Sequence, residues 1–182
     1  MAPRAKIPQT PAVRVLHSLG VPFTPHFYEY EERGGAAHAA EVLGLPLHQV
    51  VKTVVFEDER GNGVIVLQHG DRDSSAQALA RELGVKSLRP CHPDKVTRLT
   101  GYQVGGTSPF GIREGLPVYV EASVLALPEI YLNGGKRGFL MGMAPAALEE
   151  FLHARAVRVA VDKKPSGQGP SGQGPDSTRR RG

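Results

Sequence analysis

Lys52 and Thr53 are the first residues whose type and surroundings could support chemistry. They stand inside the β-branched run Val50–Phe56, so the lysine is expected on a strand that has a buried face. Two interpretations are open. The ammonium group could point into a cavity at a phosphate or carbonyl oxygen, or the lysine could protect a sheet edge against aggregation.

A glycine-rich segment, Gly101–Gly111, is the second candidate. It reads GYQVGGTSPFG, and its glycines would let the backbone approach a ligand closely. Such a loop can turn several N–H groups toward a carbonyl or an oxyanion. Ser108 is not predicted to be a nucleophile, because the nucleophile elbow needs a glycine where Phe110 stands. The alternative is a plain turn between strands.

The third candidate is the segment Asn133–Gly138, which reads NGGKRG between two predicted strands. As a hairpin it would need no function, because the two glycines supply positive φ angles and the cations are solvated. As a site, its Lys136 and Arg137 would bind phosphate on a loop that backbone can approach.

The absence of several sequence motifs excludes the kinds of chemistry that depend on them. There is no dinucleotide-binding fingerprint, no P-loop and no HExxH motif. The histidines at positions 17, 26, 38, 48, 69, 92 and 153 show no metal-ligand spacing, and a single cysteine, Cys91, excludes an internal disulfide. Neither a metal nor a cofactor is therefore predicted.

The elements that must position these candidates alternate between helix and strand. Helices that end at a glycine are predicted at Pro11–Leu19, Ala36–Leu43, Ser75–Leu83 and Asp94–Thr100, and a further helix at Pro145–Ala154. Strands are predicted at Phe23–Tyr30, Val50–Glu57, Val64–Gln68, Pro117–Glu121, Glu129–Leu132, Phe139–Met143 and Val157–Val161. Asn62-Gly63 indicates a hairpin. Without a regular βαβ repeat, this order favours an α+β domain with a mixed, largely antiparallel sheet.

The composition is that of an ordinary globular chain, since 40% of the 182 residues are hydrophobic and 22% are charged. No apolar run reaches the length of a membrane helix, and the first residues lack the apolar core of a signal peptide. A cytoplasmic protein without membrane contact is therefore expected. The net charge of +4 resides in residues 163–182, because residues 1–162 hold 17 basic and 17 acidic side chains. An anionic ligand must then be bound by a few placed cations.

The chain divides into three parts on the same grounds. Residues 1–9 are predicted to form a flexible arm, and residues 10–162 the folded domain. Residues 163–182 are predicted to be a disordered basic tail, rich in glycine, proline and serine, that contains the pentapeptide SGQGP twice. Its Arg179–Arg181 could hold RNA weakly or could simply keep the chain in solution.

Four motifs stand in an order that resembles a known family. They are Thr10–Val13, Val51–Thr53, the string Leu99–Gly111 and Gly134–Gly138. Together they resemble the YbaK/EbsC family of free-standing aminoacyl-tRNA deacylases, which are related to the bacterial prolyl-tRNA synthetase editing domain. The likeness covers residues 10–162, and it implies the fold of that domain, a barrel-like sheet with surrounding helices.

The resemblance implies trans-editing, which is hydrolysis of the ester that joins a wrong amino acid to tRNA, as in Cys-tRNA(Pro). It makes Lys52 the principal catalytic residue. Substrate-binding residues would be Tyr28, Thr53, Gly105, Gly106, Thr107, Ser108, Pro109, Asn133, Gly134, Gly135, Lys136 and Arg137. The implied partners are the acceptor end of a mischarged tRNA and an aminoacyl-tRNA synthetase that delivers it.

Two positions depart from the cysteine-specific pattern of that family. Leu140 stands where an acidic residue is usual, and Asn133 replaces a serine. The amino acid removed is therefore open, with alanine, serine, threonine or a non-standard amino acid as alternatives to cysteine. A second hypothesis follows from the lost acidic residue: a non-catalytic module that binds tRNA or a nucleotide beside a synthetase.

Overall fold

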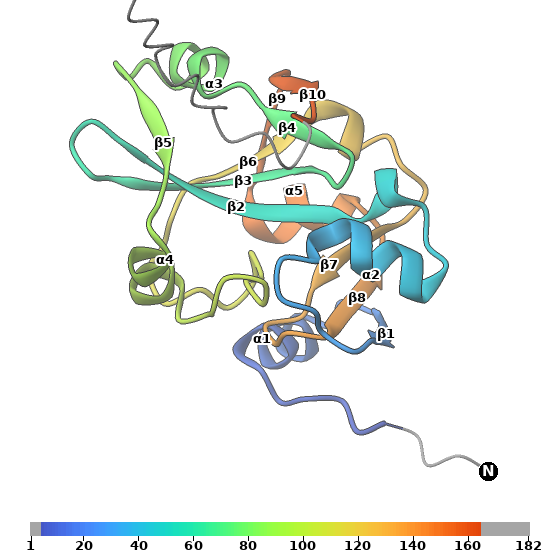
Figure 1. Cartoon of the computed structure of the whole chain (residues 1–182). Helices are drawn as coiled ribbons and strands as arrows, with labels where there is room; N and C mark the ends of the chain where they lie inside the picture. Colours follow the sequence, from blue (N-terminus) through green and yellow to red (C-terminus); the bar gives the residue numbers. More distant parts are fainter. Residues whose placement is uncertain (1–4, 165–182) are drawn as a thin grey trace, which may run out of the picture.

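The structure, a computed structural model, describes residues 5–164 (Figure 1). Residues 5–9, from the predicted arm, form neither helix nor strand there. The predicted disordered tail lies outside the described residues except for Lys163 and Lys164. Among the described residues, no helix is both long enough and apolar enough to cross a membrane.

A five-stranded sheet forms the centre of the fold, in the order β5-β2-β3-β6-β9. Its strands are β2 (Val51–Asp58), β3 (Gly63–His69), β5 (Leu88–Pro90), β6 (Val118–Glu121) and β9 (Arg155–Val157). β2 pairs antiparallel with both β3 and β5, whereas β3–β6 and β6–β9 are parallel pairs. The hairpin predicted at Asn62-Gly63 is therefore confirmed as the β2–β3 connection.

Two smaller antiparallel sheets complete the strands. One has the order β1-β8-β7, built from β1 (Thr24–Phe27), β7 (Ile130–Asn133) and β8 (Phe139–Met143). The other pairs β4 (Arg72–Ser74) with β10 (Ala160–Asp162). A single parallel bridge between Val50 and Tyr131 links the first of these to the central sheet. Among residues 5–164 the sheets thus stay open and do not close into a barrel.

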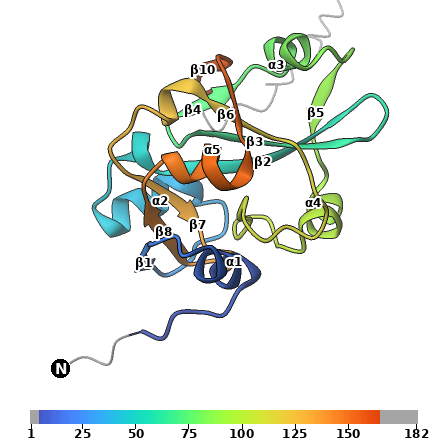
Figure 2. The same ribbon diagram turned by 180° about the vertical axis from the view of Figure 1, so that it is seen from behind.

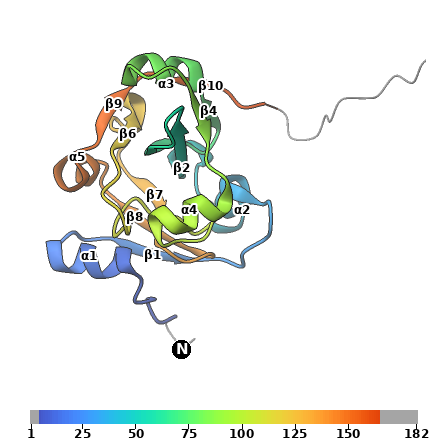
Figure 3. The same ribbon diagram turned by 90° about the vertical axis from the view of Figure 1, so that its left-hand side faces the viewer.

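Within the described part of the chain, five helices cover these sheets, at α1 (Pro11–Leu19), α2 (Gly35–Leu43), α3 (Ala76–Leu83), α4 (Pro93–Thr100) and α5 (Ala146–Leu152). The hydroxyl groups of Thr10 and Ser75 cap the first turns of α1 and α3. Left-handed glycines end α1 to α4, as the sequence predicts. Figure 2 shows α5 on the opposite side of the central sheet from α2, and Figure 3 shows helices around β2.

The arrangement confirms the predicted α+β class with a mixed, largely antiparallel sheet. Two element boundaries were wrong. The strand predicted at Phe23–Tyr30 ends at Phe27. The Tyr28 N–H makes one more bond to the opposite strand, to Gly138 O at 3.0 Å, and the pairing stops there because Gly138 has a positive φ and belongs to the turn before β8. The strand predicted at Val157–Val161 is instead the end of β9 followed by β10, which pairs with β4.

Candidate functional site

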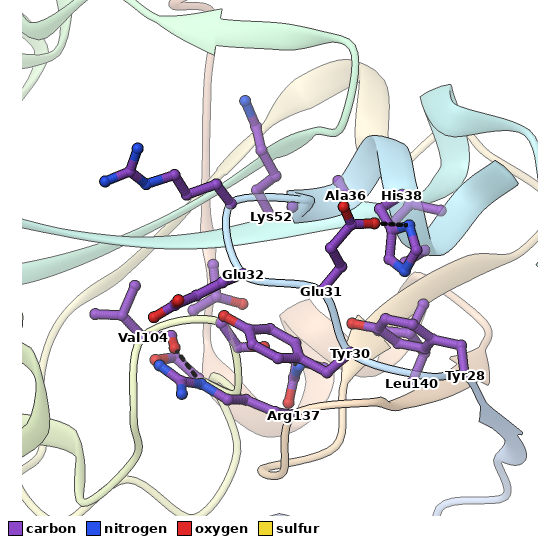
Figure 4. Close-up of a pocket in the computed structure, with 18 of the residues that line it drawn as sticks. Tyr28, Tyr30, Glu31, Glu32, Ala36, His38, Lys52, Val104, Arg137 and Leu140 are labelled. Atoms are coloured by element: carbon purple, nitrogen blue, oxygen red, sulfur yellow. Dashed lines mark hydrogen bonds and ion pairs between the residues drawn. The ribbon is translucent and has the colours of Figure 1, made fainter. Parts of the chain in front are cut away.

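A cavity of about 540 Å³ opens beside the N-terminal half of β2. Its walls come from β2, from the start of α2, from the segment Tyr28–Arg33 and from the two glycine-rich loops that the sequence singles out (Figure 4). This volume lies within the range of small-molecule sites. The lining residues that carry polar side chains are Tyr28, Tyr30, Glu31, Glu32, Arg33, His38, Lys52, Thr53, Thr107, Asn133 and Arg137.

The backbone of β2 is itself part of this cavity. β5 covers the free side of β2 only at Phe56–Asp58, so the stretch that lines the cavity lacks a β5 partner. The Asp58 N–H bonds to Asn62 O across the hairpin, whereas Val55 O accepts from the Cys91 N–H on the other side. Along an antiparallel strand, the N–H and C=O groups of successive residues point alternately to one side and the other. Thr53 is two residues before Val55, so its N–H and C=O point to the same side as Val55 O, away from β3 and toward the cavity.

Lys52 and Thr53 point to opposite faces of β2, as neighbours on a strand must. Thr53 shares its face with the core residues Val51 and Val55. Its hydroxyl oxygen is buried and has no hydrogen-bond partner among residues 5–164. A buried hydroxyl without a partner is unfavourable in the free protein, so a ligand that bonded to it would remove that cost.

The Lys52 ammonium is already engaged by the neighbouring strand β4. Its Nζ donates to Arg72 O at 2.5 Å and to Asp73 Oδ1 at 3.0 Å, and 22% of the side chain is exposed. In Figure 4 the amine points away from Tyr28, Tyr30 and Leu140. Lys52 therefore lines the cavity, while its charge is held by β4.

The two glycine-rich loops pack against each other and against Tyr30. Asn133 Nδ2 donates to Gly105 O at 2.9 Å, and Arg137 Nε donates to Val104 O at 3.0 Å. The Arg137 guanidinium also lies over the Tyr30 ring, 4.8 Å from its centre. Gly105 has a φ of +88°, and a Cβ there would lie 2.8 Å from the Tyr30 hydroxyl oxygen. Arg137 thus ties three segments into one wall.

Beneath this wall the chain is packed for stability. Ser108 is fully buried, and its hydroxyl accepts from the Phe110 N–H at 3.2 Å. The Tyr102 hydroxyl donates to Phe110 O at 2.6 Å, and burial raises the pKa of Tyr102 to about 12. Thr10 donates its hydroxyl to Gly134 O at 2.5 Å, which ties α1 to the second loop. These contacts give Ser108, Tyr102 and Thr10 a structural role that requires no ligand.

The predicted site residues therefore separate into two groups. Those that line the cavity are Tyr28, Lys52, Thr53, Gly105, Thr107, Asn133 and Arg137. Those that lie outside its lining are Gly106, Ser108, Pro109, Gly134, Gly135 and Lys136. The segment Asn133–Gly138 is a β7–β8 hairpin, with Gly135 and Gly138 at positive φ angles.

Sequence reasoning missed the outer wall of the cavity, Tyr30–Arg33 and His38. His38 Nδ1 lies 3.1 Å from Glu31 Oε2, and its Nε2 lies 2.9 Å from Glu29 O, so α2 holds this wall in place. The signal in the sequence was the Gly34-Gly35 pair at the start of α2, because adjacent glycines indicate a turn and Gly35 does adopt a positive φ there. Burial raises the pKa of Tyr28 on the same wall, so its phenol stays protonated and able to donate.

The floor is apolar where Leu140 lies. This side chain is 4% exposed and clusters with Ala39, Val50 and Tyr131. The cavity carboxylates instead come from Glu31 and Glu32, in the outer wall.

The structure also brings His48, His69 and Asp71 together outside the cavity. The imidazoles stack 3.7 Å apart, and both nitrogens of His69 are used, by His48 O at 2.7 Å and the Ser123 hydroxyl at 2.6 Å. Burial lowers the pKa of His69, which favours the neutral ring. In parallel stacked rings the nitrogen lone pairs point in parallel directions and do not converge on one metal ion. The cluster is therefore better suited to fastening the 3₁₀ turn Leu47–Gln49 to β3.

The family of the chain follows from comparison with known proteins. The family model described as the aminoacyl-tRNA editing domain matches residues 31–151, which include both cavity loops and β2. The chain belongs to this editing-domain family. Its resemblance to the YbaK/EbsC proteins and to the prolyl-tRNA synthetase editing domain is thereby confirmed.

Relatives of the editing domain include free-standing and fused proteins. The chain is 28% identical over 149 residues to EbsC of Enterococcus faecalis, a candidate Cys-tRNA(Pro)/Cys-tRNA(Cys) deacylase, covering 81% of this chain and 91% of EbsC. It is 24% identical to a proline–tRNA ligase of Shouchella clausii, over 91% of this chain and 28% of the ligase. Among solved structures, a candidate trans-editing enzyme for prolyl-tRNA synthetase matches with a TM-score of 0.74 at 26% identity, covering 87% of this chain and 100% of that one.

Proposed function

We propose that this editing domain is an aminoacyl-tRNA deacylase that acts in trans on a mischarged tRNA. The observation that supports this most is the cavity itself. In a chain of the editing-domain family, it gathers the backbone edge of β2, the Thr53 hydroxyl and the loop at Gly105 around one space. Its volume of about 540 Å³ can take an amino acid together with part of the terminal nucleoside.

The reaction does not require a strong nucleophile from the protein. An aminoacyl ester is already activated, so positioning it and polarising its carbonyl can supply much of the acceleration. Candidate donors to that oxygen are the Thr53 N–H and hydroxyl, with the Gly105 loop opposite. Water adds to the acyl carbon, the bond to the ribose oxygen breaks, and that oxygen takes the proton. Among the described residues that line the cavity there is no serine or cysteine, which fits such a mechanism.

The amino acid is the open part of this proposal. Cysteine could use its own thiolate to attack the ester, whereas alanine, serine or threonine would depend on water. Leu140 offers no carboxylate to an α-ammonium group at the floor, so that group would turn toward Glu31 and Glu32 in the outer wall. This placement does not favour cysteine over the other small amino acids.

A panel of mischarged tRNAs tests the function. Release of labelled amino acid from Cys-, Ala-, Ser- and Thr-tRNA(Pro) is measured under single-turnover conditions, with correctly charged Pro-tRNA(Pro) as the control. We expect at least one mischarged species to be hydrolysed well above its rate in buffer, with the control spared. Binding of tRNA without hydrolysis of any species would instead support a non-catalytic module, which the pairing of Lys52 with Asp73 also allows.

Replacing Thr53 with valine should separate activity from stability. Valine keeps the shape but removes a buried hydroxyl that has no partner within residues 5–164, so the melting temperature should stay the same or rise. If the hydroxyl binds the ester, hydrolysis should fall about two- to tenfold. Thr53→Ser, which keeps the hydroxyl, should retain most of the rate. Equal rates for wild type and Thr53→Val would remove Thr53 from the site.

The salt dependence of tRNA binding should be shallow. Residues 1–162 carry no net charge, so only a few cations, such as Lys52, Arg33 and Arg137 at the cavity, can meet phosphate. The logarithm of the binding constant should fall linearly with the logarithm of the salt concentration, and the slope should correspond to about two to four neutralised phosphates. Filter binding of deacylated tRNA between low and physiological salt measures it for the chain with and without residues 163–182, which carry the net charge. A far steeper slope that persists without these residues would require a basic surface elsewhere.

A further inference from the structure

The charge of Lys52 is neutralised in the free protein by a carboxylate on another strand. Its Nζ contacts Asp73 Oδ1 at 3.0 Å and the carbonyl of Arg72. Asp73 is held in register by β10, where it pairs with Val161, so its place does not depend on Lys52. Asp73 and Arg72 lie outside the cavity lining, whereas Lys52 belongs to it. An anionic ligand that enters the cavity therefore meets a lysine that is already paired.

Asp73 has other favourable partners, a backbone N–H donor and a nearby positive charge, that remain if Lys52 departs. The Lys164 N–H donates to Asp73 Oδ2 at 3.4 Å. Burial alone would raise the pKa of Asp73, but the hydrogen bond and charge of Lys52, the Lys164 N–H and the charge of Lys163 hold that pKa below its usual value. Because 40% of the Asp73 side chain is also exposed, water can replace the lost contact. The free-energy cost of separating Asp73 from Lys52 is therefore small for the carboxylate.

We propose that Asp73 is a positioning residue that holds the Lys52 ammonium at the cavity rim until an anionic group of the tRNA acceptor end takes its place. The inference rests on the proposed function, since it names how that site receives its substrate. The carboxylate and the tRNA phosphate then compete for one ammonium. The apparent affinity for tRNA falls as the fraction of molecules in which Asp73 holds Lys52 rises, because only molecules with a free ammonium can use it to bind the anion.

Two isosteric variants with the same change in charge test this competition. Asp73→Asn removes the carboxylate charge and keeps the shape. Asp162→Asn is the matched control, because Asp162 pairs with Arg72 on the adjacent strand, is 96% exposed and does not contact Lys52. Measured quantities are the Kd for deacylated tRNA and the KM and kcat for the best mischarged substrate.

We expect Asp73→Asn to lower Kd and KM by about two- to fivefold, the range of a partly exposed ion pair, and to leave kcat within about twofold. Asp162→Asn should change Kd by less than half as much. In a Lys52→Met background, Asp73→Asn should have no effect. Asp73→Glu, which restores the charge, should return Kd toward the wild-type value.

Several results would overturn the proposal. Equal gains for Asp73→Asn and Asp162→Asn, or a gain that persists in Lys52→Met, would indicate general repulsion of tRNA. A fall in kcat with no change in KM would mean that Asp73 organises the site without competing. Absence of tRNA binding would leave no anion to exchange. Because Kd uses deacylated tRNA, a Lys52-dependent gain without hydrolysis would contradict the deacylase function and still support the exchange.

Discussion

Replacing Lys52 with methionine is expected to slow single-turnover hydrolysis of the best mischarged tRNA by about ten- to a hundredfold. Methionine keeps the apolar stem that lines the cavity. It removes the one charged hydrogen bond that the ammonium would make to the bound substrate, worth roughly 1.5–3 kcal/mol. Lys52→Arg should recover the rate only in part, because a planar guanidinium fits a site shaped for a point charge poorly. Rates at saturating protein separate this loss from weaker binding.

The control is Lys86→Met, which removes an exposed lysine outside the cavity lining and should change the rate by less than about twofold. Thermal unfolding of both variants shows whether the fold survives. If Lys52→Met kept the wild-type rate and only lost stability or aggregated, the lysine would serve β4 and the sheet edge. The interpretation of Lys52 as a catalytic residue would then be wrong.

The fold was largely predictable from short-range signals. Glycines at 20, 44, 84 and 101 end their helices in the left-handed conformation, a local requirement that can be read from sequence. The β2–β3 hairpin follows from its turn and its β-branched runs for the same reason. β4 was missed, and β10 was merged with β9, because each has three residues, too few for a periodic pattern, and the two paired strands lie almost ninety positions apart.

For the candidate site, the sequence indicated the segments that line the cavity better than it indicated how their side chains lie. The glycine-rich loops and β2 do meet at one cavity. Adjacent residues on a strand face opposite sides, yet nothing in the run Val50–Phe56 shows which side would be the core. The pairing of Lys52 with Asp73 also depends on β4, which sequence did not reveal. Contacts between distant short strands are therefore where sequence reasoning stopped.

Replacing Gly105 with alanine is expected to reduce kcat/KM by about tenfold or more. Its φ of +88° is costly for any residue with a Cβ, by roughly 1–2 kcal/mol. The new methyl group would also lie 2.8 Å from the Tyr30 hydroxyl oxygen. Tyr30 cannot move aside freely, because Arg137 stacks on its ring and also bonds to Val104 O. The wall must therefore shift, and small misplacements of a bound ester lower the rate steeply.

Gly115→Ala provides the matched control for this effect. A Cβ at Gly115 would have no atom within 4 Å, its φ is not positive, and the residue does not line the cavity. It should therefore leave kcat/KM within about twofold and stability unchanged. Hydrolysis is compared for the two variants beside their melting temperatures. If Gly105→Ala melted lower but hydrolysed the ester at the wild-type rate, the loop would be structural and the ester would be held elsewhere. A loss of rate that exceeds the loss of folded protein would instead show that the shape of this wall sets the position of the ester.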